Sequence, residues 1–215
     1  WTPMHAVCQA AHMSERQPRA WLLIAAGETR QYGGNTGYDD QVDAYYTWDS
    51  TVSNYRNIQR GDAIALWDKR RLLGISVVED IKSYERTKFS YRCPACQRTN
   101  IKARFTKSPR YRCQKCGAEF DKPVAEVVEV TEYRSRHDAA WTSLEGLLDA
   151  GELRGLCEKP DSQLSMRALD WEAFQAAVTG RGAGTALERV LSRAVGGSLR
   201  AELSGGHTRA FVRVR

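Results

Sequence analysis

The sequence predicts an α+β protein: a β-sheet domain that carries an inserted metal-binding ribbon and is flanked by helices. Short apolar runs of strand length recur between residues 21 and 130. Four paired cysteines interrupt those runs, and segments with helical spacing follow residue 140. A length of 215 residues suits one elaborated domain with an insertion.

The strands are expected where apolar runs lie between turn residues. The first is residues 21–26 and the second is residues 45–48. Residues 63–67 and 72–78 flank a polar turn and are expected to form a hairpin. Residues 124–130 are expected to return to the same sheet after the cysteine segment.

The helices are expected in the later part of the chain. Residues 140–150 place apolar side chains at helical spacing, and Gly151 follows. Asp170 can cap a helix that runs to Gly180. Residues 186–195 are expected to form one more helix.

The chain divides into four parts on composition. Residues 1–20 are expected to be a disordered leader, with Met13 as a candidate natural start. Residues 21–180 form the main domain, and residues 82–122 form the ribbon inserted in it. Residues 181–215 are rich in Gly and Arg, and we expect them to lead into a further domain.

Four cysteines are spaced as a structural zinc site: Cys93, Cys96, Cys113 and Cys116. Two CxxC pairs supply the four thiolates that tetrahedral Zn²⁺ prefers, and four protein ligands leave no position for a catalytic water. Gly117 follows the second pair, where a positive φ is often required. The sequence therefore predicts one structural Zn²⁺ and a reducing compartment rather than a disulfide-bonded secreted domain.

Positive charge is concentrated in the ribbon. Residues 82–122 hold twelve Lys/Arg and three acids, an excess larger than the net charge of +6 of the whole chain. Such segregation favours a polyanionic partner, whereas a solvated brace for the sheet domain is the plainer alternative. We expect the DNA backbone to be contacted by Arg104, Lys107, Arg110, Arg112, Lys115 and, outside the ribbon, Arg167.

Aromatic residues gather in the first part of the main domain. Tyr46 and Trp48 share one face of a strand, and Asp49 and Ser50 follow at its end. Aromatic rings beside a carboxylate suit a flipped nucleobase, while burial in a hydrophobic core is the alternative role for such rings. The loop from 27 to 43 is longer than ordinary connections and contains Tyr32 and Tyr38.

The order of several short motifs resembles an EVE-type domain of the PUA superfamily. The matching features are the strand at Trp21, the Tyr46–Ser50 segment, Asn57 with Gly61 and Asp62, the return at Leu73, Gly74 and Ile75, and the closing segment 165–170. The chain resembles the N-terminal sensor of modification-dependent endonucleases that end in an HNH nuclease. This resemblance implies a PUA-like mixed β-barrel, related to SRA and YTH domains, flanked by helices.

The resemblance also implies a function and a site. In that family the barrel flips a modified base out of duplex DNA into an aromatic cage, here 5-methyl- or 5-hydroxymethylcytosine. The residues implied for the pocket are Tyr46, Trp48, Asp49, Ser50, Tyr32 and Tyr38. The partner would be double-stranded DNA carrying a modified base, in the cytoplasm of a bacterium, with a homodimer formed through the nuclease domain.

No catalytic constellation is recognisable, so this chain is expected to be a reader and not an enzyme. It has four His, no HNH-like metal array, and one weak pair, His137 with Asp138, that we expect on a surface turn. No apolar run is long enough to span a membrane. Two other functions stay open: an RNA reader of a methylated base, and an adaptor whose ribbon binds protein.

Overall fold

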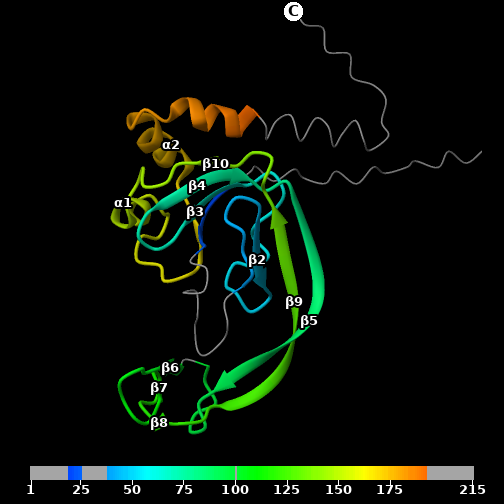
Figure 1. The fold of residues 1–215 in the computed structure, drawn as a ribbon, viewed down its shortest axis with the longest axis vertical. Helices are drawn as coiled ribbons and strands as arrows, with labels where there is room; N and C mark the ends of the chain where they lie inside the picture. Colours follow the sequence, from blue (N-terminus) through cyan, green and yellow to red (C-terminus); the bar gives the residue numbers. More distant parts are fainter. Residues whose placement is uncertain (1–18, 26–37, 100, 193–215) are drawn as a thin grey trace, which may run out of the picture.

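The computed structural model describes residues 19–25, 38–99 and 101–192, and these residues form an α+β fold built mostly of sheets. Figure 1 shows a body of sheet and helices, a long curved arm and a small ribbon at the far end of the arm. Most of the expected leader, Tyr32 in the long loop and residues 193–215 lie outside the described residues.

A five-stranded sheet forms the body, in the order β10-β4-β3-β1-β11. The strand β1 runs parallel to β3, and the other pairs are antiparallel. The bounds are β1 Ala20–Ile24, β3 Ala63–Trp67, β4 Leu72–Val77, β10 Thr142–Ser143 and β11 Met166–Ala168.

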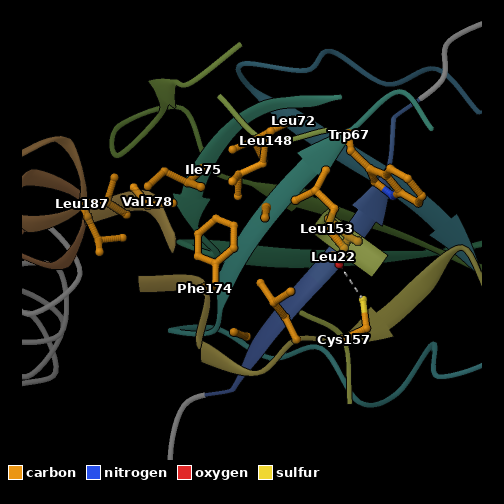
Figure 2. Packing of buried hydrophobic residues seen from close by; sticks show 14 of the residues in the cluster. Leu22, Trp67, Leu72, Ile75, Leu148, Leu153, Cys157, Phe174, Val178 and Leu187 are labelled. Carbon is orange, nitrogen blue, oxygen red and sulfur yellow. Dashed lines mark hydrogen bonds between the residues drawn. The ribbon is translucent and has the colours of Figure 1, made fainter. Parts of the chain in front are cut away.

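Both faces of this sheet are buried, because alternate residues of β1 point to opposite sides. Leu22 and Ile24 join a cluster under the helices, and Figure 2 shows Phe174, Val178 and Leu187 converging on it. Trp21 and Leu23 join a second cluster on the opposite face. The helices are α1 Ala150–Gly155 and α2 Trp171–Gly180, and residues 184–192 are also helical.

A second sheet, in the order β2-β9-β5, extends from the body as the arm. The strands are β2 Tyr45–Asp49, β5 Asp80–Arg92 and β9 Val124–Arg136. The strands β5 and β9 pair along all of their length, from Asp80 opposite Arg136 to Arg92 opposite Val124. Since β2 is short, the outer half of the arm is a hairpin of two strands. At about 3.4 Å per residue the arm is roughly 44 Å long.

The ribbon lies between the outer ends of β5 and β9 (Figure 1). Its sheet has the order β6-β7-β8, with β6 Ile101–Ala103, β7 Tyr111–Cys113 and β8 Glu119–Phe120. The insertion thus has two parts, an arm of paired strands and the cysteine-containing ribbon at its end.

Several expected elements are confirmed. The strands near residues 21, 45, 63, 72 and 124 are present. Asp170 caps α2, since its carboxylate accepts from the backbone N–H of Ala173 at 3.0 Å. The last expected helix is present as far as residue 192, with Leu187 and Val190 buried.

The helix expected at residues 140–150 is wrong. Residues 142–143 instead pair with β4, and Gly146 has a φ of 75°. The ring of Trp141 packs so closely over Gly74 that a Cβ at that glycine would lie 2.5 Å from it. The apolar spacing that resembled a helix therefore belongs to an extended segment and a turn.

The described strands form open sheets and no closed barrel, so the α+β class is confirmed but the expected PUA-like barrel is not. At residues 78–79 the chain passes from β4 into β5 and leaves the first sheet for the second. Glu79 donates its backbone N–H to the carbonyl of Arg136 at 2.9 Å, which fixes this change of sheet.

Candidate metal centre and basic surface

The four cysteines come together at the end of the arm. Their sulfur atoms all lie within 4.8 Å of one another. The Sγ atoms of Cys93 and Cys116 are 3.7 Å apart, and those of Cys96 and Cys113 are 3.6 Å apart. Four sulfurs at about 2.3 Å from a tetrahedral Zn²⁺ would be roughly 3.8 Å apart. The cluster is therefore positioned to hold a metal ion, and its dimensions suit zinc.

The two CxxC turns share one backbone geometry. The carbonyl of Cys93 accepts from Gln97 N–H at 2.9 Å, and the carbonyl of Cys113 accepts from Gly117 N–H at 3.0 Å. Gln97 and Gly117 both have positive φ, 58° and 76°. The expected positive φ at Gly117 is confirmed. In the first turn Gln97 adopts the same conformation although it carries a side chain.

The four sulfurs affect one another's protonation. The backbone N–H of Cys116, together with that of Lys115, lowers the pKa of Cys113 to about 6. The N–H of Arg98 lowers the pKa of Cys96, but burial and the neighbouring sulfurs raise it to about 12. Sulfurs this close do not all ionise by themselves, so a metal that binds them displaces protons.

Apolar burial in the ribbon is small. Among the described residues of the ribbon, the fully buried ones in its cluster are Cys93, Ile101 and Cys113. The rings of Tyr111 and Phe120 pack against them and stack on each other, with their centres 6.1 Å apart. A core of this size does not hold a fold together without a metal or disulfides. Two of the three buried residues, Cys93 and Cys113, belong to the cysteine cluster, so little apolar burial remains in the ribbon apart from the candidate metal site.

A basic hollow of about 540 Å³ opens on the ribbon. Its cations are Lys102, Arg104, Lys107 and Arg112, and no carboxylate lines it. The register of β6 and β7 explains the arrangement, because Lys102 lies directly opposite Arg112 while Ile101 lies opposite buried Cys113. The sheet thus turns its apolar side toward the cysteine cluster and its cations toward solvent.

The residues expected at the DNA backbone separate into three groups. Lys107, Arg110, Arg112 and Lys115 are exposed on the ribbon. Arg104 lines the hollow, but its guanidinium is engaged within the ribbon. It donates to the carbonyl of Pro109 and pairs with Glu119 at 2.5 Å. That hydrogen bond lowers the pKa of Glu119.

Arg167 lies apart from this surface, and its buried position gives no support to the expected contact with the DNA backbone. It lies in the body, is 4% exposed and donates Nε–H to the carbonyl of Leu164 at 2.9 Å. Its guanidinium lies 5.2 Å from the ring centre of Trp67. Burial lowers its pKa, which marks a side chain held inside the protein.

The rings expected in the base pocket are interior in this structure. Tyr46 is 0% exposed and Trp48 is 1% exposed, and both belong to the second cluster of the body. Trp48 stacks on Tyr133 at 5.6 Å and donates Nε1–H to the carbonyl of Tyr55 at 3.0 Å. Packing, the alternative that the sequence left open, is the role seen for both rings.

Asp49 is also buried, at 2% exposed. Its carboxylate accepts from Tyr38 Oη at 2.7 Å and Thr51 N–H at 2.8 Å, and it forms an ion pair with Lys88. Burial alone would raise the pKa of Asp49, but these hydrogen bonds lower it overall. The structure brings Tyr38 and Asp49 together, and the next residue, Ser50, bonds the N–H of Thr131 at 3.1 Å.

His137 is not on a surface turn, so that expectation is wrong. It is 0% exposed, and its Nε2 lies 2.9 Å from the carbonyl of Val42. Burial lowers its pKa, which keeps the ring neutral. It is part of the body's interior and forms no dyad with Asp138 among the described contacts.

Two residues of the basic surface were not among the expected contacts: Lys102, which was counted only in the charge of the ribbon, and Phe105. Both line the hollow, and Phe105 is 91% exposed. The available signal was an aromatic residue placed between Arg104 and Lys107 in a segment of otherwise polar residues.

Searches with family models, against curated proteins and against solved structures gave no match to this chain. None of the helices in the described part of the chain has the length and apolar character needed to cross a membrane.

Proposed function

We propose that this chain is a DNA-binding module whose zinc ribbon contacts the phosphate backbone of a duplex. The observation that carries the proposal is the hollow with four cations and no lining carboxylate. Phosphate contacts by Lys and Arg supply most of the sequence-independent affinity of DNA-binding proteins. In this proposal Zn²⁺ is structural and orders the cations.

The arrangement of charge favours a role in binding over a role in solubility alone. Lys102 and Arg112 are directly opposed across two strands, and like charges in that position destabilise a sheet. Among the ion pairs of the described residues, none involves Lys102, Lys107 or Arg112. A phosphate between them would relieve this repulsion. A ribbon that only braced the body would gain nothing from such a pair.

We further propose that the body reads a modified cytosine, as the resemblance to EVE-type domains implies. The candidate region is the aromatic group of Trp48, Tyr55 and Tyr133 beside Asp49. Tyr55 and Tyr133 are half-buried, so they form the accessible side of this group. A flipped base would have to displace these two rings to reach Trp48. This displacement would add to the few kcal/mol that flipping the base out of the duplex itself costs.

The ribbon part of the proposal is tested by salt dependence. A variant with Lys102→Gln, Lys107→Gln and Arg112→Gln should show a shallower slope of log affinity against log salt, by about 0.9 for each phosphate that the variant no longer neutralises. A matched variant with Arg70→Gln, Lys159→Gln and Arg189→Gln removes the same charge from the body and should keep the slope. Equal slopes in all three proteins would refute backbone contact by the ribbon.

The base-reading part is tested with one duplex sequence that carries plain, methylated, hydroxymethylated or glucosylated cytosine. Wild-type protein should prefer one modified duplex, and Tyr133→Leu should reduce that preference more than it reduces binding to plain DNA. A wild-type protein that binds all four duplexes equally would contradict modified-base reading and leave only backbone binding.

A further inference from the structure

Phe105 differs from the other exposed apolar side chains of the molecule. It is 91% exposed, compared with 57% for Phe89 and 62% for Val127 on the arm. It also lines the hollow with Lys102, Lys107 and Arg112. A single exposed apolar residue needs no explanation in general. An exposed aromatic ring that shares a hollow with three cations does, because it places a stacking surface beside groups that can bind phosphate.

The loop that carries Phe105 is anchored at its base. Arg104 donates its backbone N–H to the carbonyl of Arg110 at 2.7 Å, and its Nε–H to the carbonyl of Pro109 at 3.1 Å. The N–H of Arg110 bonds Asp121 at 2.9 Å. Because these bonds fix both ends of the loop, Phe105 is presented from a defined position.

The charge around the ring matches a strand of nucleotides. Lys102 and Arg112 project from the paired strands β6 and β7, and Lys107 projects from the loop. Glu119 lies opposite Arg112 across β7 and β8 and attracts Arg112 and Lys107, but its direct ion pair is with Arg104. Three cations around one ring can contact phosphates on either side of a single base.

We propose that the hollow binds one unpaired nucleotide, with its base stacked on Phe105 and the flanking phosphates on Lys102, Lys107 and Arg112. This inference rests on the proposed nucleic-acid binding by the ribbon and extends it to a preference for unpaired bases. Aromatic side chains within basic grooves bind single strands in this way, with little dependence on base identity. A blunt duplex offers the phosphates but hides the face of the base.

The ribbon is placed where it can reach such a nucleotide. It lies at the far end of the arm, away from the sheet and helices of the body (Figure 1). The body and the ribbon can therefore contact different points of one duplex. A nucleotide left without its partner by base flipping is one source for the ribbon site, and a bulge or a single-stranded end is another.

The test compares a blunt duplex, the same duplex with one unpaired bulged base, and single strands of DNA and RNA of equal length. A 2-aminopurine in the bulge reports stacking by the quenching of its fluorescence. The zinc-loaded full chain should bind the bulged duplex about tenfold more tightly than the blunt one, and it should quench the probe.

Three variants sharpen the test. Phe105→Ala should remove the preference and the quenching but keep the salt slope, Phe105→Trp should keep both, and Phe89→Ala is the matched control on the arm. A wild-type preference that persists in Phe105→Ala would overturn the site, as would equal binding of bulged and blunt duplex. Tighter binding of the RNA or the DNA strand identifies the sugar and supports the site in either case. Absence of binding to every nucleic acid refutes instead the proposed function.

Discussion

The body and the ribbon hold their folds in different ways. The body has two large apolar clusters, one on each face of its main sheet, and they bury Trp21, Trp48, Trp67 and Phe174. Among its described residues the ribbon has three that are fully buried, and two of them, Cys93 and Cys113, belong to the cysteine cluster. Hydrophobic burial accounts for the body, whereas the ribbon has little of it, so we expect a metal at the cysteine cluster to hold the ribbon and each part to be disrupted without the other.

The two parts also differ in where their charged groups lie. In the body, the charged and polar groups Asp49, Asp62 and Arg167 are buried and bonded. On the ribbon, the strand pairing turns cations toward solvent. A small metal-held unit can expose much charge because it does not depend on a core that charge would disrupt.

The largest expected effect is the loss of the metal. Cys113→Ser should abolish stoichiometric zinc binding and unfold the ribbon, because structural zinc contributes about 10–16 kcal/mol in comparable small units. Limited proteolysis should then cut between residues 93 and 123, while thermal unfolding of the body changes little. Cys157→Ser, at a buried cysteine of the body, should keep the zinc. Joint unfolding of both parts in Cys113→Ser would contradict their independence.

The converse change is a cavity in the body. Phe174 is 0% exposed at the centre of the cluster in Figure 2, so Phe174→Ala should cost about 3–5 kcal/mol in the free energy of unfolding. Chemical denaturation followed by tryptophan fluorescence measures the loss. Zinc content should stay at one ion per chain, and a parallel loss of zinc would show that the two parts fold together.

The junction of arm and body gives a smaller effect that depends on pH. Asp49 on β2 holds Lys88 on β5, so Asp49→Asn should cost about 1.5–3 kcal/mol at pH 7. The pKa of Asp49 is lowered in the folded state, so its contribution is full above the ordinary value of 3.8 and is lost as pH falls below it. Urea unfolding of both proteins should therefore converge in acid. A constant difference at all pH values would assign the loss to packing alone.

The smallest effect is expected at the two CxxC turns. Gly117→Ala places a side chain at a φ of 76° and should weaken zinc binding by about 1 kcal/mol, roughly five- to tenfold. Gln97→Gly relaxes the equivalent position and should strengthen it by a similar or smaller amount. Competition with a chromophoric chelator measures both. Equal affinities in all three proteins would show that these turns are not strained.

The sequence allowed prediction of features that depend on local patterns. The CxxC spacing predicted the metal cluster, apolar runs predicted the strands, and Asp170 predicted the start of α2. Features that depend on contacts between distant segments were missed. The segment at Trp141 has helical spacing, but its ring fills the space above Gly74, and that contact keeps the segment extended.

The candidate site was predictable only in part for the same reason. A run of cations is visible in the sequence, but pairing decides which of them are available. Arg104 closes its own loop, Arg167 is buried beside Trp67, and Lys88 holds Asp49. Phe105 was missed because its place between Arg104 and Lys107 is a weak signal, which does not by itself show that the ring is exposed rather than buried.

The central claim is that the metal-folded ribbon, and not its charge alone, forms the nucleic-acid contact. Equilibrium binding of one plain duplex to wild-type protein and to Cys113→Ser tests it most directly, because the substitution leaves every Lys and Arg in place. We predict that Cys113→Ser keeps a folded body but binds the duplex at least about tenfold more weakly at 0.15 M salt, a loss of about 1.4 kcal/mol. Equal affinity of the two proteins would contradict the claim.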